Sequence, residues 1–265
     1  MVDRLNEEKG ICKTGRQAMV SSYSPHFGEE KPLVGTYGSG TIFFTNCNLL
    51  CMFCQNYEIS HLGRGTEVSD EQLAGIMMDL QYQKCHNINL VSPSHVVPQL
   101  VSAIDIAAGK GLEIPVVYNT GSYDKVETLR ELEGVVDIYM PDFKFWSHDL
   151  ALKTCSVTDY RQVAVNAIGE MYRQTGNLEI SEQGLAMRGL LLRHLVMPGY
   201  TNDSKRILEH IKKDVSENTY INIMAQYHPC GQGFADASLG RVLEHREFRE
   251  VLDYAANLGF QRIDY

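Results

Sequence analysis

Short apolar runs alternate with amphipathic segments along most of the chain, from about residue 39 onward. The runs are rich in Ile, Val, Leu and aromatic residues, which is typical of parallel strands that are buried on both faces. Six such runs span residues 40–46, 87–92, 115–120, 136–143, 189–198 and 220–227. Residues 1–38 lack the pattern. We therefore predict an irregular N-terminal segment over 1–38 and one domain over 39–265.

Helix signals lie between the predicted strands. Ser69 followed by Gln72 forms a capping-box pattern, and apolar residues then recur at helical spacing. Pro98 suits the first turn of a second helix. Another helix follows residue 200, where Asn202 or Asp203 is expected to be the N-cap, and a last amphipathic helix lies near the C-terminus.

Six strand–helix units in succession predict an α/β fold with a parallel sheet and right-handed crossovers. Such units form either a doubly wound sheet or an incomplete β/α barrel. Both architectures bind their ligands at the carboxyl ends of the strands.

Composition narrows the functional classes. The chain has 265 residues and a net charge of −9, which argues against a nucleic-acid-binding surface. No apolar stretch approaches the roughly 18 residues of a membrane span, and no signal peptide is recognisable, so we expect a cytoplasmic protein without a membrane partner. Disulfides are rare there. The scattered cysteines, Cys12, Cys85, Cys155 and Cys230, are interpreted as buried or idle thiols.

The other three cysteines, Cys47, Cys51 and Cys54, follow the first predicted strand at its carboxyl end. A structural zinc site would need a fourth ligand, for which His61 is a candidate, and a ferredoxin-type cluster would need a fourth cysteine. The third alternative is a [4Fe-4S] cluster with three irons held by the protein and one left open. An open iron is a Lewis-acid position at which a small molecule can bind, so this alternative explains why no fourth thiolate is present.

The segment "CNLLCMFC" resembles the signature of the radical S-adenosylmethionine enzymes. The segments "CMFCQN", "YNT", "YMPDFK", "RHLVMPGYTND" and "QYHPCG" occur in the order and spacing of the pyruvate formate-lyase activating enzyme group, and most resemble its shorter, activating-enzyme-like members. This resemblance implies a partial barrel of six β/α units. It also implies an oxygen-sensitive oxidoreductase whose [4Fe-4S] cluster is held by the three cysteines. S-adenosylmethionine would bind the open iron and be cleaved reductively to methionine and a 5′-deoxyadenosyl radical, which takes a hydrogen atom from the substrate.

The resemblance also implies which residues bind the cosubstrate. Phe53 would lie beside the adenine, although simple loop packing is its alternative. Asn119 and Thr120 would lie near the methionyl part, Arg193 would bind the ribose or the carboxylate, and His228 would lie at the adenosyl end.

Two further pairs complete the expected site. Asp142 and Lys144 match an acid–lysine pair that faces cosubstrate and substrate. The sequence "VSPSHVV" replaces a Gly-Gly-Glu-Pro-like turn that binds the cosubstrate's ammonium group, so Ser92 and Ser94 are expected to make that contact.

Three functions remain open. The first is activation of a glycyl-radical enzyme, and the second is radical chemistry on a small molecule or on another protein. Both would require a flavodoxin- or ferredoxin-type electron donor. The third is a non-catalytic iron–sulfur or zinc protein.

Overall fold

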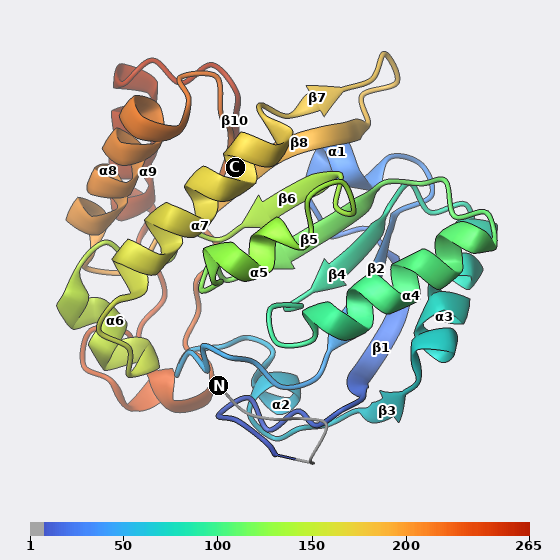
Figure 1. Cartoon of the computed structure of the whole chain (residues 1–265). Coiled ribbons are helices and arrows are strands. Elements are labelled where there is room, and N and C mark those ends of the chain that lie inside the picture. Colours follow the sequence, from blue (N-terminus) through green and yellow to red (C-terminus); the bar gives the residue numbers. More distant parts are fainter. Residues whose placement is uncertain (1–7) are drawn as a thin grey trace.

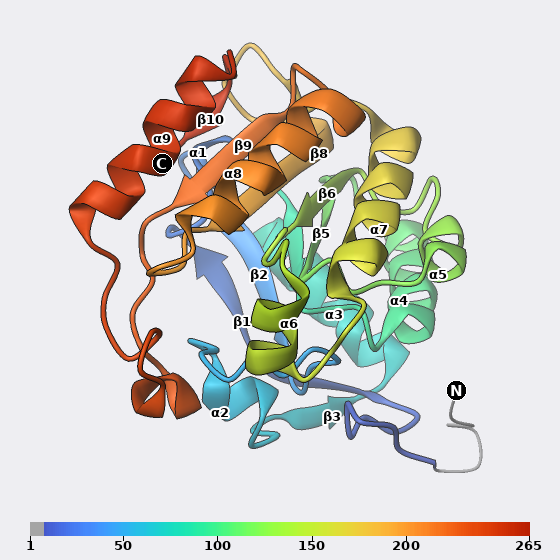
Figure 2. The same ribbon diagram turned by 90° about the vertical axis from the view of Figure 1, so that its left-hand side faces the viewer.

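The computed structural model describes residues 8–265 (Figures 1 and 2). In this part of the chain ten strands form one sheet, with the order β10-β9-β8-β6-β5-β4-β2-β1-β3 and with β7 paired to β8. The strands are β1 (Ala18–His26), β2 (Ser39–Phe44), β3 (Thr66–Val68), β4 (Ile88–Val91), β5 (Val116–Thr120), β6 (Ile138–Pro141), β7 (Glu179–Ile180), β8 (Ala186–Leu195), β9 (Tyr220–Met224) and β10 (Ile263–Asp264).

The helices cover the outer face of the sheet, as α3, α4, α7 and α8 show in Figures 1 and 2. The helices are α1 (Lys31–Val34), α2 (Tyr57–Ser60), α3 (Asp70–Tyr82), α4 (Val97–Gly109), α5 (Val126–Arg130), α6 (His148–Cys155), α7 (Tyr160–Thr175), α8 (Thr201–His210) and α9 (His245–Asn257), with a π-helix η2 (Ile211–Val215) and a 3-10 helix η3 (Gly231–Ala235). In residues 8–265 we find no helix that combines the length and the apolar character of a membrane span.

The six predicted strands are confirmed as β2, β4, β5, β6, β8 and β9, which pair in parallel in that order. A doubly wound sheet reverses its strand order at a switch point. Here the order follows the chain without reversal, so successive crossovers all lie on the same face, as in a β/α barrel. The sheet stays open between β3 and β10, and the barrel is therefore partial.

The expectation of an irregular segment over 1–38 is wrong for much of its length. β1 runs antiparallel to β2 over Ala18–His26, and α1 follows it. Three of the nine residues in β1 are serines, and only Ala18 and Val20 are buried. The strand is held by backbone pairing with β2 and β3 rather than by an apolar stripe, so its sequence carries little signal. Residues 1–7 lie outside the described part.

Two predicted helix starts are confirmed and one is wrong. Ser69 and Gln72 form a capping box at α3, and Pro98 lies in the first turn of α4. The N-cap of α8 is Tyr200, not Asn202 or Asp203. Asp203 instead accepts hydrogen bonds from the backbone N–H groups of residues 146 and 147, which anchor the start of α6.

Two apolar clusters lie on opposite faces of the sheet. Alternate strand residues point outward to the helices, as Tyr118 does, or inward, as Val117 does. The inner cluster includes Leu33 of α1, which is fully buried. The segment around α1 also reaches across the barrel, because Asn87 Nδ2 donates to Leu33 O at 2.8 Å and Asn222 Nδ2 donates to Glu30 Oε1 at 2.9 Å. α1 thus fills the interior below the carboxyl ends of the strands.

Candidate active site

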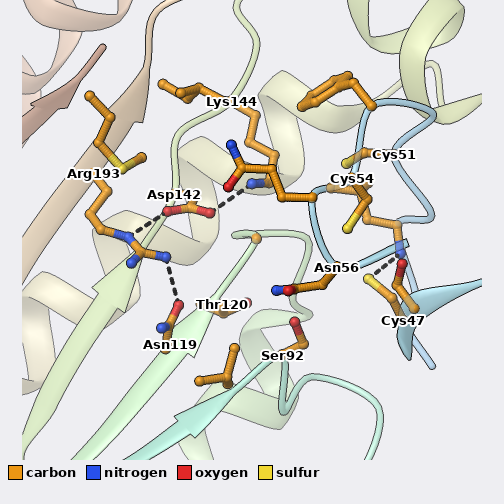
Figure 3. Close-up of a pocket in the computed structure, with 18 of the residues that line it drawn as sticks. Cys47, Cys51, Cys54, Asn56, Ser92, Asn119, Thr120, Asp142, Lys144 and Arg193 are labelled. Atoms are coloured by element: carbon orange, nitrogen blue, oxygen red, sulfur yellow. Dashed lines mark hydrogen bonds and ion pairs between the residues drawn. The ribbon is translucent and has the colours of Figure 1, made fainter. Parts of the chain in front are cut away.

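A cavity of about 390 Å³ opens at the carboxyl ends of the parallel strands. All twelve residues predicted for the site line it: Cys47, Cys51, Phe53, Cys54, Ser92, Ser94, Asn119, Thr120, Asp142, Lys144, Arg193 and His228. The cysteines lie on one side and Arg193 on the opposite side, with Asp142 and Lys144 between them (Figure 3). The structure therefore brings together side chains from six separate parts of the sequence, whereas their individual roles stay predictions.

The cysteine loop follows β2 and is fixed by backbone hydrogen bonds on both sides. Met52 N donates to Thr154 O in α6 at 2.8 Å, and Met52 O accepts from the N–H groups of residues 232 and 233 in η3. Gly231 has a φ of +53°, and a Cβ there would lie 2.4 Å from the Tyr57 ring. This close approach requires glycine, and it places η3 against the cysteine loop.

The three thiols are buried enough to favour the protonated form. Burial raises the pKa of Cys47 to about 11, with a further rise from the neighbouring Cys51. The pKa of Cys51 is raised by its hydrogen bond with Cys155 and by burial, and burial raises that of Cys54 against a hydrogen bond from Ser60. Deprotonated sulfur is stable here only beside compensating positive charge. A metal cluster supplies such charge, so the donor set fits a [4Fe-4S] group.

The zinc alternative finds no support at His61. Its Nε2 lies 3.2 Å from Leu50 O and its Nδ1 lies 2.8 Å from Ser60 Oγ, while its ring stacks on Tyr57. Within residues 8–265 no three His, Cys, Asp or Glu side chains are placed to hold a metal ion. Three sulfurs that each bind a different iron do not need to converge on one point, so the arrangement suits a cluster better than a single zinc ion.

The scattered cysteines are partly as expected. Cys12, Cys85 and Cys155 are buried, and Cys230 is half-buried. Cys155, however, is not idle, because its Sγ lies 3.2 Å from Cys51 Sγ. It ends α6, whose backbone already binds the cysteine loop, and nothing in the local sequence of Cys155 indicates this contact.

Asp142 is the centre of the charged side of the cavity. Its carboxylate accepts from Arg193 Nε at 2.7 Å and from Lys144 Nζ at 2.7 Å (Figure 3). Burial alone would raise the pKa of Asp142, but the charges and hydrogen bonds of Arg193 and Lys144 lower it to about 2. Asp142 is therefore a permanent anion at neutral pH, and it holds two cations in fixed positions.

Arg193 has more protein partners than the sequence analysis expects. Its Nη2 donates to Asn119 Oδ1 at 2.8 Å, and its Nη1 lies 3.5 Å from Glu30 Oε1 and 3.9 Å from Glu29 Oε2. Two of its three nitrogens thus donate hydrogen bonds within the protein, and the third lies within ion-pair distance of two carboxylates. The acids come from the segment between β1 and α1, where the sequence gives no indication of a site. Burial raises the pKa of Glu29, opposed by Arg193.

A chain of hydroxyl groups forms the third part of the site. Ser94 Oγ lies 2.9 Å from Thr120 Oγ1, and Thr120 Oγ1 donates to Asp124 Oδ2 at 2.6 Å. Asp124, which is 4% exposed, was not recognised from the sequence. Ser92 adopts a left-handed conformation with a φ of +59°, and its N–H donates to Asn119 O at 2.9 Å.

The two remaining predicted residues differ in exposure. Phe53 is 6% exposed and packs against Phe145 and Tyr227, with ring centroids 6.1 and 5.8 Å away. These contacts agree with loop packing, although part of Phe53 also lines the cavity. His228 is exposed, and its Nδ1 lies 3.2 Å from Gln226 O. It therefore lies at the solvent-exposed edge of the cavity.

The chain matches no family model. It is 29% identical over 257 residues to an uncharacterized protein of Methanocaldococcus jannaschii, an alignment that covers 94% of this chain and 70% of that protein.

Three solved structures share its fold. Methylornithine synthase has a TM-score of 0.55 at 13% identity, with 80% of this chain and 59% of that chain covered. SuiB of Streptococcus suis, bound to the precursor peptide SuiA, has a TM-score of 0.55 at 9% identity, with 83% and 46% covered. Native anSMEcpe with bound AdoMet has a TM-score of 0.52 at 11% identity, with 80% and 57% covered. The chain thus spans less than two thirds of the length of each of these structures. At such identities the likeness establishes the fold alone, and the chain shares the partial β/α barrel fold of these three proteins.

Proposed function

We propose that the protein is a radical S-adenosylmethionine enzyme whose cluster is held by Cys47, Cys51 and Cys54. The observation that carries this proposal is a cavity in which the thiols of one buried and two half-buried cysteines face a charged and hydroxyl-lined wall. Its volume of about 390 Å³ lies within the range of pockets that hold one small ligand. When bound, a reduced cluster supplies the electron that splits S-adenosylmethionine into methionine and a 5′-deoxyadenosyl radical.

The residues of the chain would bind and orient the cosubstrate. Asp142 is an ionised acceptor for a ribose or an ammonium group, and Lys144 beside it is a cation for a carboxylate. Arg193 would act chiefly through Asp142 and Asn119, which it holds in place, rather than by gripping the cosubstrate with its whole fork. Buried walls around these groups keep water from the reacting atoms.

For the substrate we propose a glycine of a partner protein, as in the activation of glycyl-radical enzymes. The motifs shared with the activating-enzyme group support this choice. SuiB, which has the same fold, was solved with a precursor peptide, so a fold of this kind accepts a peptide chain. A flavodoxin- or ferredoxin-type protein would supply the electron. Radical chemistry on a small molecule is the alternative, and it shares every step up to cosubstrate cleavage.

Anaerobic reconstitution with iron and sulfide, followed by dithionite and S-adenosylmethionine, tests the proposal. We expect release of 5′-deoxyadenosine from the wild-type protein and none from Cys51→Ala. Cys85→Ala is the matched control, because Cys85 is equally buried but does not line the cavity. A wild-type protein that holds a full cluster yet releases no 5′-deoxyadenosine would refute the proposal. A glycyl-radical signal in electron paramagnetic resonance, after a candidate partner enzyme is added, separates the two substrate classes.

A further inference from the structure

Cys155 contacts the cysteine loop from outside the cavity. Its Sγ lies 3.2 Å from the Sγ of Cys51, and both residues are 8% exposed. Cys51 lines the cavity, whereas Cys155 does not. Cys155 is therefore not placed to bind an iron itself, and it reaches the cluster site only through the sulfur of Cys51.

The backbone fixes the approach of the two sulfurs. Cys155 is the last residue of α6, and the carbonyl group of the preceding Thr154 accepts a hydrogen bond from Met52 N at 2.8 Å. Met52 in turn follows Cys51 in the loop. The contact between the sulfurs thus lies beside a backbone hydrogen bond that joins the same two segments, so it does not depend on the side chains alone.

The direction of the sulfur–sulfur hydrogen bond follows from what Cys51 becomes when it holds iron. A cysteine binds a metal as the thiolate, which has no proton left to donate. A thiol can act as a weak donor, and a cysteine sulfur can accept. With Cys51 bound to iron, the proton between the two sulfurs therefore belongs to Cys155, and Cys51 accepts it.

The other two cluster cysteines also have hydrogen-bond donors. Leu49 N donates to Cys47 Sγ at 3.4 Å, and the Ser60 hydroxyl donates to the sulfur of Cys54. Both donors come from the local sequence around the cysteines, whereas the donor for Cys51 is 104 residues away along the chain. The protein thus provides a donor to each of the three sulfurs, and it uses α6 to provide the third.

We propose that Cys155 is a positioning residue whose thiol donates a hydrogen bond to the Cys51 sulfur of the loaded protein and thereby raises the reduction potential of the cluster. The inference rests on the proposed function. Reduction adds negative charge to a cluster and its sulfurs, and a donor to a sulfur stabilises the more negative form more strongly. Through Cys51, the thiol of Cys155 would make the reduced state needed for cosubstrate cleavage easier to reach.

A redox titration of the anaerobically reconstituted protein, followed by electron paramagnetic resonance of the reduced cluster, tests this inference. We expect a more negative midpoint potential in Cys155→Ala than in the wild type, because the variant has no donor. Cys155→Ser keeps a proton to donate, so its midpoint potential should lie closer to that of the wild type. Cys85→Ala is the matched control and should leave the potential unchanged, because Cys85 is equally buried but does not line the cavity.

Infrared spectroscopy of the S–H stretching vibration detects the proton itself and does not require the alanine variant to fold. The loaded wild-type protein should show an S–H band that Cys155→Ser lacks and Cys85→Ala retains. Equal midpoint potentials in the wild type and Cys155→Ala would overturn the inference, and so would the absence of an S–H band that depends on Cys155. A wild-type protein that assembles no [4Fe-4S] cluster would instead refute the proposed function itself.

Discussion

Replacing Arg193 by methionine should destabilise the protein far more than replacing Lys144 by methionine. Both cations contact Asp142 at 2.7 Å and both are largely buried. Arg193, however, also lies within 4 Å of two further carboxylates, those of Glu29 at 3.9 Å and Glu30 at 3.5 Å. Glu30 Oε2 is buried and has no hydrogen-bond partner, and within residues 8–265 Arg193 is the cation that pairs with this carboxylate.

The magnitude follows from what each variant leaves behind. Without Lys144, Asp142 still has Arg193 as its cationic partner. The free energy of unfolding should then fall by the contribution of one charged hydrogen bond, about 1–2 kcal/mol. Without Arg193, Glu30 loses the one ion-pair partner it has among residues 8–265, Glu29 keeps only His26, and Asp142 keeps only Lys144. Removal of one partner from a buried ion pair typically costs about 3–5 kcal/mol, because the remaining charge is uncompensated.

The pH dependence gives a second signature. In the wild type the pKa of Asp142 lies at about 2, below its usual value of 3.8, so its contribution to stability is complete above about pH 4 and is lost as the pH falls toward 2. In Arg193→Met the pKa of Glu29, which burial already raises, should rise further because the opposing charge of Arg193 is gone. Glu29 then takes up a proton as the pH falls below neutrality, and the deficit in unfolding free energy relative to wild type should shrink.

Urea-induced unfolding, followed by circular dichroism at several pH values, measures both effects. We expect the Arg193 variant to be the less stable one at neutral pH, with a deficit that narrows in mild acid. Equal losses of unfolding free energy in the two variants, or a loss that does not depend on pH, would show that Arg193 does not compensate the carboxylate charges on this side of the cavity.

Two further outcomes are expected. Leu33→Ala should lower the free energy of unfolding, measured by urea denaturation, by about 2–5 kcal/mol, because Leu33 is fully buried inside the barrel. Leu62→Ala is the control and should change this free energy little, because Leu62 is 58% exposed. Similar losses for both variants would mean that α1 does not support the interior. Treatment of the cluster-free protein with diamide should form a disulfide between Cys51 and Cys155, because their sulfurs lie 3.2 Å apart. Peptide mass spectrometry without reduction should detect this disulfide in the wild type and not in Cys155→Ser. A disulfide between another pair of cysteines would contradict the geometry.

Much of the fold and of the site's location could be predicted from the sequence. The parallel strands are buried on both faces, so their apolar runs are plain, and their carboxyl ends meet at one edge of the sheet. Residues as distant as Ser94 and Arg193 therefore had to lie near one another. The three cysteines could be recognised as one site from their spacing within a short stretch of the sequence.

The parts that could not be predicted depend on tertiary contacts. β1 has a serine-rich sequence and exists because β2 offers it hydrogen-bonding partners. Glu29 reaches Arg193 only because the chain after β1 crosses the barrel interior. Asp124 and Cys155 have ordinary sequence surroundings, and only the packing of the loops brings one to Thr120 and the other to Cys51. The partners of Arg193 likewise depend on the direction of its side chain, and no sequence pattern predicts that direction.

Mössbauer spectroscopy of protein reconstituted anaerobically with ⁵⁷Fe distinguishes the individual irons of a cluster and therefore tests whether one iron is left open by the protein. We expect a [4Fe-4S] cluster in which one of the four irons changes its signal when S-adenosylmethionine is added, while the other three, held by Cys47, Cys51 and Cys54, do not. Four irons that stay unchanged on addition of the cosubstrate, or a protein that takes up zinc and no cluster, would contradict it.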